Sequence, residues 1–149
     1  MVSEDNQELH ELLPVAFKVA ELRQVMLPCM VIGDGFIKSH ALENIRVLSD
    51  DFLRRFVGPP NRMYQPGFDL YTLTGTHTDT DLTMEGQVGQ DFAYRFLRKA
   101  FLASMHVMNQ LLGTRLEVVE HYRTEDADMV MVVIGSGVGV VKDVVDYYR

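Results

Sequence analysis

Two short, uninterrupted apolar runs constrain the fold of this chain more than any other feature of its sequence. Residues 25–32 form the first run and residues 129–134 the second, and each stops at a turn that contains glycine. Neither run alternates between apolar and polar residues, which is typical of strands covered on both faces of a parallel sheet. Because helical periodicity precedes the first run and follows the second, the sequence predicts an α/β fold.

The spacing of apolar residues before the first run predicts a helix that ends near Ala20. Ser3 is the expected N-cap of this helix. Pro14 lacks the backbone N–H that would bond to the carbonyl of His10, so we expect a kink or a break there. A second, short helix is expected at residues 50–56.

Residues 87–112 form the longest periodic segment and predict one long helix that ends at Gly113. Two adjacent apolar rows run along it, which makes the apolar face wider than that of an ordinary surface helix. The first row is Val88, Phe92, Phe96, Ala100, Ala103, Val107 and Leu111, and the second is Ala93, Leu97, Phe101, Met105, Met108 and Leu112. We therefore expect the helix to be buried against more than one neighbour, one of which belongs to another subunit.

The segments around the long helix carry weaker signals. Between the short helix and residue 86, about 28 residues show no clear element, which predicts a linker that crosses between domains. After the long helix, residues 116–123 are expected to be extended, residues 125–128 to form a turn, and residues 140–148 to form a helix. A strand, a turn and one helix need further strands to pack on. The predicted sheet is therefore incomplete at residue 149.

Composition narrows the classes of partner. The chain has 149 residues with a formal net charge of -7 and a pI near 5.1, which argues against nucleic acid and anionic membranes as partners. The only cysteine, Cys29, excludes an internal disulfide and an iron-sulfur cluster held by this chain, because a cluster takes about four thiolates. Cys29 lies in the first apolar run, where a buried thiol is inert. An acidic chain without a signal-like start is expected in the cytoplasm.

The turn after the second apolar run resembles a phosphate-binding loop in its setting. Gly135, Gly137 and Gly139 follow a predicted strand and precede a predicted helix, where backbone N–H groups can meet a phosphate. The dinucleotide fingerprint needs G-x-G-x-x-G and an acid about 20 residues later, and both are missing. A tight strand-to-helix turn is the favoured interpretation, with a nucleotide-binding α/β module as the alternative.

Two other polar groups are candidates for sites. His77, Asp79 and Asp81 alternate in sequence, so an extended backbone would place them on one side, as a divalent metal requires. No fourth ligand is evident, and a solvated loop is the expected structure. Ser39 next to His40 suggests a nucleophile and a base, but no acid is placed to orient the imidazole. We expect Ser39 to form local turn bonds instead.

Two stretches of the sequence carry a resemblance to a known family. Residues 4–8, followed by the apolar strand and the motif Asp34-Gly35-Phe36-Ile37-Lys38-Ser39-His40, resemble the end of the pyrimidine-binding domain of pyruvate and related 2-oxoacid:ferredoxin oxidoreductases. Residues 122–128, the strand up to Ile134, Gly135-Ser136 and residues 142–146 look like the opening of the second, transketolase-C-like domain of the same alpha subunit. The two stretches occur in the family's order.

The resemblance implies a component of a thiamine-diphosphate-dependent enzyme that oxidises pyruvate or a related 2-oxoacid to acyl-coenzyme A. Electrons then pass through iron-sulfur clusters to ferredoxin or flavodoxin. Its partners are the beta, gamma and delta subunits or their fused equivalents. Thiamine diphosphate and the clusters belong to the whole complex, and this chain alone is expected to hold neither and to be inactive. No catalytic residue carries over, so the matched residues are signature positions only: Asp34, Gly35, Phe36, Ser39, His40, Gly135 and Ser136.

The resemblance also implies a division of the chain. Residues 1–48 are expected to be the C-terminal part of the pyrimidine-binding domain, and residues 49–86 a linker or extended loop. Residues 87–149 would then hold the long helix and the first strand, turn and helix of an incomplete doubly wound domain. Pro14, Gly33 and the unaligned residues 74–86 depart from the family pattern and leave the 2-oxoacid open. A stand-alone interaction protein that dimerises through the long helix is a further alternative.

Overall fold

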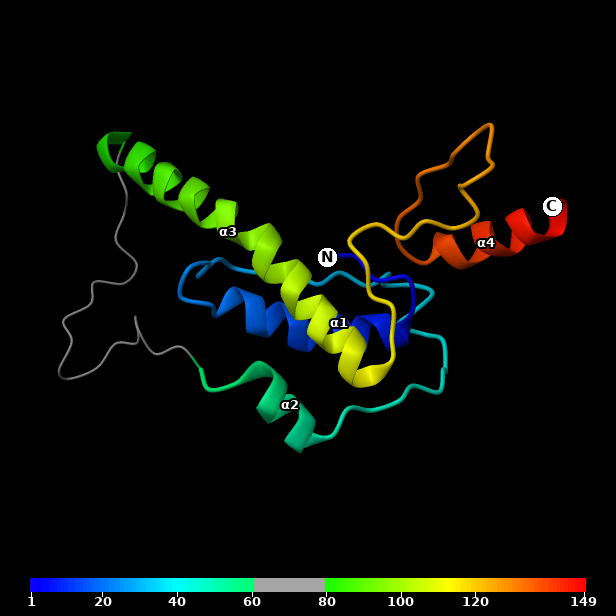
Figure 1. Ribbon diagram of the computed structural model, residues 1–149, viewed down its shortest axis with the longest axis horizontal. Helices are drawn as coiled ribbons and strands as arrows, with labels where there is room; N and C mark the ends of the chain where they lie inside the picture. Colours follow the sequence, from blue (N-terminus) through cyan, green and yellow to red (C-terminus); the bar gives the residue numbers. More distant parts are fainter. Residues whose placement is uncertain (61–79) are drawn as a thin grey trace.

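The computed structural model describes residues 1–60 and 80–149, and their architecture is helical (Figure 1). The helices are α1 (Asn6–Ala20), α2 (Asp50–Val57), α3 (Thr80–Leu112) and α4 (Gly137–Tyr148). Helix α1 packs against both α2 and α3. Helix α4 lies with the segment that follows α3, away from α2. The described residues contain no strand longer than one isolated parallel bridge between Val2 and Ile32.

Within the described ranges, no helix combines the length and the hydropathy that are needed to cross a bilayer.

Helix α1 begins two residues after its predicted start and does not break. Its N-cap is Asp5, whose Oδ1 accepts a hydrogen bond from the Glu8 N–H at 2.7 Å. The predicted N-cap, Ser3, is wrong, because Ser3 is buried and its backbone N–H bonds to the carbonyl of Ile32 at 3.0 Å. The helix also continues through Pro14 to Ala20, so of the predicted kink or break the break does not occur. Pro14 is itself buried, and packing around it outweighs one missing hydrogen bond.

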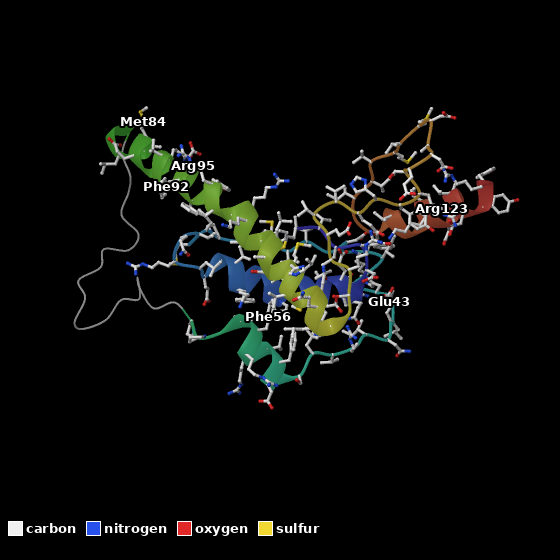
Figure 2. All side chains as sticks on the ribbon, viewed as in Figure 1. Glu43, Phe56, Met84, Phe92, Arg95 and Arg123 are labelled. Carbon is white, nitrogen blue, oxygen red and sulfur yellow. The ribbon has the colours of Figure 1, made fainter. Side chains whose placement is uncertain are left out.

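The core lies where α1, α2 and α3 meet. Val15 and Met108 are fully buried there, and Phe56 of α2 is 4% exposed. Figure 2 shows Phe56 between α2 and the two helices it supports. The Lys18 ammonium of α1 donates to the carbonyl of Phe56 and lies 4.9 Å from the centre of its ring. The other core residues of this cluster are Leu12, Val19, Val25, Met105 and Leu116.

The short helix and the long helix occur close to where the sequence places them. Helix α2 spans Asp50–Val57, with the Ser49 hydroxyl accepting from the Phe52 N–H at 3.3 Å. Helix α3 ends as predicted at Gly113, which has a φ of +68° and donates its N–H to the Asn109 carbonyl at 2.8 Å. It begins at Thr80, seven residues before the predicted start at residue 87.

Among the described residues, only the C-terminal half of α3 is packed against other elements. Met105 and Met108 are buried against α1, whereas Val88 is 61% and Phe92 is 59% exposed. In Figure 1 the N-terminal half of α3 extends beyond α1. The expected burial of this exposed half against another subunit stays a prediction, because the described chain includes no partner.

The predicted strands do not form among the described residues. Val25 lies in a turn, and residues 26–32 have no regular secondary structure apart from the bridge at Ile32. The Met30 carbonyl also accepts a hydrogen bond from the Met1 ammonium at 2.8 Å, and Cys29 is exposed rather than buried. Residues 116–123 and 129–134 have no strand partner either. A strand exists through its hydrogen bonds to a neighbour, so an apolar run without one stays irregular. The described residues thus give no confirmation of the α/β architecture.

Apolar side chains are exposed in the last part of the described chain. Instead of forming a buried strand, residues 129–134 expose Met129 at 89%, Met131 at 73% and Val132 at 93%. Helix α4 has no buried residue. The turn expected at residues 125–128 is also present, with the Ala127 N–H bonded to the Thr124 carbonyl. The end of the described chain therefore carries apolar groups that nothing within it covers.

Candidate functional site: the junction of two signature segments

The first signature segment folds as a turn, which places its polar groups together. The Asp34 Oδ1 accepts hydrogen bonds from the N–H groups of Phe36 at 2.9 Å and Ile37 at 3.3 Å. The Ser39 hydroxyl bonds to the Gly35 carbonyl four residues back. This confirms the prediction of a local turn role for Ser39. The exposed ring of Phe36 points away from the core.

Ser39 and His40 are in contact with each other. The segment is a turn rather than a strand, and Ser39 Oγ lies 2.9 Å from His40 Nδ1. The same Nδ1 lies 3.1 Å from the carbonyl oxygen of Phe36. A nucleophile needs its base to be oriented by an acid, and in the described residues no carboxylate bonds to His40. The pair is therefore part of the turn.

The second signature segment begins α4 and reaches back to the first. Gly135 has a φ of +82°, and Ser136 takes the N-cap position of α4 without bonding to its own helix. Its hydroxyl donates instead to Oδ2 of Asp34, which lies 102 positions earlier in the chain. This bond, followed by the N–H groups of Phe36 and Ile37, holds the pKa of the Asp34 carboxyl below its ordinary value. Two of the signature positions are thus in direct contact.

An ionic cluster lies beside this contact and joins the start of the chain to α4. The Lys142 ammonium bonds to Glu4 at 2.8 and 3.1 Å and to Glu120 at 2.8 Å. Partial burial acts to lower the pKa of Lys142, but the bonds to Glu120 and Glu4 outweigh it, and the pKa lies above its ordinary value. We call the Asp34–Ser136 contact and the Lys142 cluster together the junction.

A buried lysine supports the first signature segment. Lys38 is 6% exposed, and its ammonium donates to the carbonyl and, at 3.0 Å, to the hydroxyl of Ser3. Asn6 at the start of α1 donates to the Lys38 carbonyl at 3.3 Å. Sequence reasoning missed Lys38 and Ser3 as a pair, because lysine is normally exposed and no periodicity points to this contact. The contacts of Lys38 with Ser3 and Asn6 hold the turn against the start of α1.

The phosphate-binding interpretation of the glycine turn is not favoured by this geometry. The Asp34 carboxylate lies at the N-terminus of α4, because it accepts the Ser136 hydroxyl there. A carboxylate at that position uses the positive end of the helix dipole and repels a phosphate. A tight turn is present, but it comprises only Gly135 and Ser136, because α4 already begins at Gly137, three residues before its predicted start at residue 140.

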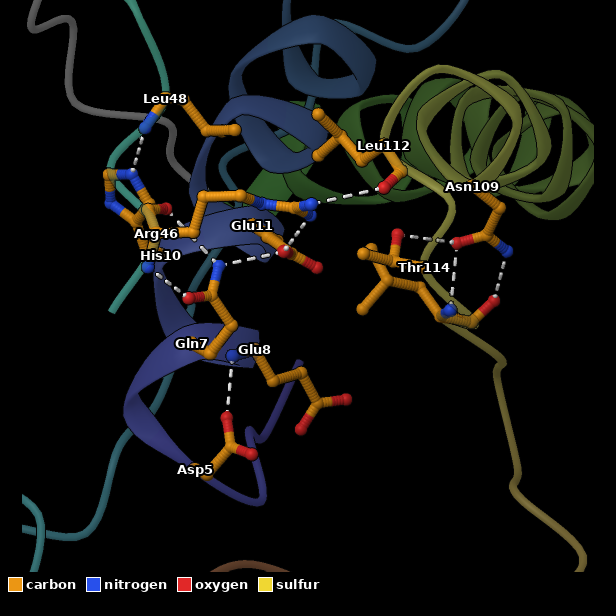
Figure 3. A network of polar contacts seen from close by, with 11 residues as sticks. Asp5, Gln7, Glu8, His10, Glu11, Arg46, Leu48, Asn109, Leu112 and Thr114 are labelled. Atoms are coloured by element: carbon orange, nitrogen blue, oxygen red, sulfur yellow. Dashed lines mark hydrogen bonds and ion pairs between the residues drawn. The ribbon is translucent and has the colours of Figure 1, made fainter. Parts of the chain in front are cut away.

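Figure 3 shows a second polar network, between α1 and the end of α3. Arg46 bonds to Glu11 at 3.4 Å and to the carbonyl of Leu112 at 3.2 Å, so it also satisfies the C-terminus of α3. Gln7 bonds to Glu11 at 2.7 Å, and His10 Nε2 accepts the Leu48 N–H at 3.1 Å. These contacts attach the segment before α2 to the core.

An open groove of about 420 Å³ lies beside this network. The residues that line it show whether thiamine diphosphate could bind there. Five carboxylates face it, from Glu4, Asp5, Glu8, Glu11 and Glu120, with the cations Arg46 and Arg115. Burial raises the pKa of Glu8 above its ordinary value, and the Glu4 N–H partly offsets this. A diphosphate needs cationic and N–H donors, so the groove does not fit that cofactor.

Metal binding also finds no support in the described part of the chain. No group of three or more His, Cys, Asp and Glu side chains in residues 1–60 and 80–149 is arranged to hold a metal ion. The side chains of the candidate ligands His77, Asp79 and Asp81 lie outside what the structure describes. Cys29, a single thiol, does not suffice for an iron-sulfur cluster.

Comparison with known proteins gives one consistent result. Residues 1–129 match the family described as pyruvate flavodoxin/ferredoxin oxidoreductase, thiamine diphosphate-binding. Pyruvate synthase subunit PorA of Thermotoga maritima is 34% identical, over 100% of this chain and 38% of the relative. The same subunit of Methanothermobacter thermautotrophicus is 33% identical, over 98% of this chain and 38% of its own length.

Another similar protein is named for a different substrate. Ketoisovalerate oxidoreductase subunit VorA of Pyrococcus horikoshii is 30% identical, over 99% of this chain and 37% of the relative. The chain thus spans less than two fifths of the length of these curated relatives. The match over residues 1–129 and the order of the two signature segments agree, and the chain belongs to the thiamine diphosphate-binding pyruvate flavodoxin/ferredoxin oxidoreductase family.

Proposed function

We propose that this chain is a piece of the alpha subunit of a 2-oxoacid:ferredoxin oxidoreductase and that it is structural rather than catalytic. The observation that carries the proposal is the hydrogen bond between Ser136 and Asp34, which joins the two signature segments across 102 positions. The relatives named pyruvate synthase and ketoisovalerate oxidoreductase support the class of enzyme. Pyruvate and a branched 2-oxoacid are the substrates these names suggest.

The residues of the junction would hold one domain of the enzyme against the next. In this proposal residues 1–48 end the pyrimidine-binding domain, residues 49–86 form the linker, and residues 87–149 lead into the second domain. Lys142 with Glu4, and Ser136 with Asp34, then set the angle between the two domains. Such positioning residues affect a reaction by fixing where distant groups lie.

The cofactors of the enzyme would be held outside the described residues. Thiamine diphosphate supplies the carbanion chemistry when bound, and iron-sulfur clusters supply one-electron transfer. Neither the acidic groove nor Cys29 offers a suitable set of donors, so no step of the reaction is assigned to these residues. The other subunits, and ferredoxin or flavodoxin, are the partners that follow from this proposal.

Purification of the tagged chain from its own cells tests the proposal. We expect larger chains to be recovered with it, together with bound thiamine diphosphate and iron, and with dye reduction that depends on a 2-oxoacid. Recovery of the chain without these partners would contradict the proposal.

A pair of variants sharpens the test. Val132, which is 93% exposed, is part of the apolar surface at residues 129–134. We expect Val132→Lys to lower the recovery of larger chains about tenfold, because a charge in a buried contact is costly. Gln24→Lys adds the same charge at an exposed polar position and should leave recovery unchanged. Equal recovery with both variants would show that this surface is not the contact.

A further inference from the structure

The exposed half of α3 carries a stripe with an ordered sequence of chemical types. Residues 81, 85, 88, 92, 95 and 99 follow one another at alternating spacings of four and three, as on a heptad seam, and we call them the α3 seam. Read along the chain, they are two acids, two apolar residues and two bases: Asp81, Glu85, Val88, Phe92, Arg95 and Lys99. At 3.6 residues per turn all six positions lie within an arc of about 80°.

The side chains of this seam from Glu85 onward face away from the core. Met105 and Met108 pack on α1, and the helical register places them on the opposite side of α3. Val88 and Phe92 are 61% and 59% exposed, and Glu85, Arg95 and Lys99 are exposed as well. In Figure 2, Phe92 and Arg95 lie on the half of α3 that extends beyond α1.

The apolar centre of the seam is already organised. The rings of Phe92 and Phe96 are 5.4 Å apart in an edge-to-face arrangement, and the Arg95 guanidinium lies 5.9 Å from the Phe92 ring. In the ranges 1–60 and 80–149, no ion pair joins Glu85 or Arg95 to another residue. These two charges, one on each side of the apolar centre, are therefore available to an incoming surface.

The order of these residues is symmetric about residue 90. Val88 and Phe92 lie two positions before and after residue 90, and Glu85 and Arg95 lie five positions before and after it. Residues 81 and 99 lie nine positions before and after it. Two copies of α3 that run antiparallel and cross at residue 90 would therefore place acid against base at four places and apolar against apolar at the centre. A partner of unrelated sequence would not require this symmetry, whereas a second copy of the chain does.

We propose that the α3 seam is a self-association surface at which α3 of two copies of this chain pairs antiparallel. Each Glu85 carboxylate then faces the Arg95 guanidinium of the other copy, and Val88 packs against Phe92. The proposal concerns the assembly of this chain with itself and stands on the geometry of α3, independently of the proposed function.

Charge reversal at one pair of positions tests the pairing in the full chain by sedimentation equilibrium. The unmodified chain should show a concentration-dependent dimer, and raised NaCl should weaken it by screening. Glu85→Lys and Arg95→Glu should each weaken the dimer about tenfold or more, because each sets two like-charged pairs at the contact. An equimolar mixture of the two variants should regain the association, because the lysine introduced at position 85 of one copy then faces the glutamate introduced at position 95 of the other.

Two control variants carry the same charge reversals outside α3. Glu43→Lys and Arg23→Glu make the same reversals at exposed positions outside α3 and should associate like the unmodified chain. A monomer at all concentrations, or variants that associate normally, would overturn the proposal. Tighter association of Glu85→Lys with the unmodified chain would also overturn it, because that result indicates parallel pairing. Recovery of larger chains with Glu85→Lys separates this proposal from the proposed function.

Discussion

At the scale of single residues, the most informative contact is the one between Asp34 and Ser136. The Asp34 pKa is lowered first by the Ser136 hydroxyl and then by two backbone N–H groups. We expect Ser136→Ala to raise the Asp34 pKa toward its ordinary value, as measured by carboxyl ¹³C shifts in an NMR titration. Ser39→Ala, whose hydroxyl bonds to Gly35 and not to Asp34, should leave the titration of Asp34 unchanged.

The same pKa has a consequence for stability against pH. Because folding depresses the pKa, ionised Asp34 stabilises the folded chain above the ordinary aspartate pKa, near 4. This stabilisation is lost as the pH falls through the depressed value. Ser136→Ala should therefore flatten the loss of stability below about pH 4. An Asp34 titration that does not change in Ser136→Ala would show that the two segments do not meet through this bond.

Asn109 is a second residue whose role comes from its side-chain bonds. Its amide donates to the Leu116 carbonyl and accepts the Leu116 N–H, both at 2.8 Å, so it closes the turn after α3. Leu116 is 7% exposed, and Asn109→Ala would leave both of its backbone groups unpaired. We expect a loss of about 2–3 kcal/mol in the free energy of unfolding, measured with urea. Gln110→Ala, at the neighbouring exposed position, should change it by less than about 0.5 kcal/mol.

At the scale of elements, the packing of α3 on α1 holds the described core together. Met108 is fully buried at this contact, next to Val15 of α1. We expect Met108→Ala to lower the free energy of unfolding by about 2–5 kcal/mol, because the cavity it leaves fills only partly. Val107→Ala removes an apolar side chain that is 41% exposed and serves as the matched control. Similar losses for the two variants in thermal unfolding would mean that α3 does not pack on α1 through this face.

The two halves of α3 therefore differ in what stabilises them. The C-terminal half is stabilised by burial of Met105 and Met108 and by Arg46 at the Leu112 carbonyl. The N-terminal half has no such burial within the described chain, and two glycines, Gly86 and Gly89, lower its helix propensity by about 1 kcal/mol each. A contact with a second copy at the α3 seam would supply the missing stabilisation.

At the scale of the whole molecule, α4 is attached to the rest by polar contacts. It has no buried residue, and Lys142 links it to Glu4 and Glu120, while Asp146 pairs with Arg123. We expect Lys142→Met to speed amide hydrogen exchange in residues 137–148 about three- to tenfold, because partly exposed ion pairs contribute about 0.5–1 kcal/mol each. Raised NaCl should move the unmodified chain in the same direction.

A lysine outside the junction provides the control for this prediction. Lys99→Met removes the same charge from α3, where Lys99 is exposed, and should leave the exchange of α4 unchanged. If exchange in α4 proved equally slow without Lys142, other contacts would have to hold it.

The local chemistry of the sequence was sufficient to predict several elements. Ser49 begins α2 because its hydroxyl caps the helix, and Gly113 ends α3 because only glycine adopts its positive φ without strain. The turn at Ser39 follows in the same way from hydrogen bonds within four residues. The resemblance to the oxidoreductases also came from linear motifs, and the match over residues 1–129 confirms it.

Other features depended on tertiary contacts that no local pattern encodes. The apolar runs at residues 25–32 and 129–134 have the composition of strands, but a strand needs a neighbour to accept its hydrogen bonds, and the described residues provide none beyond the bridge at Ile32. The contact between Asp34 and Ser136 spans 102 positions. The sequence by itself thus determined the existence of the helices, the end of α3 at Gly113, the local turns and the family, because these depend on neighbouring residues. Only the tertiary structure decided which surfaces are buried and which distant side chains meet, because these depend on how the whole chain packs.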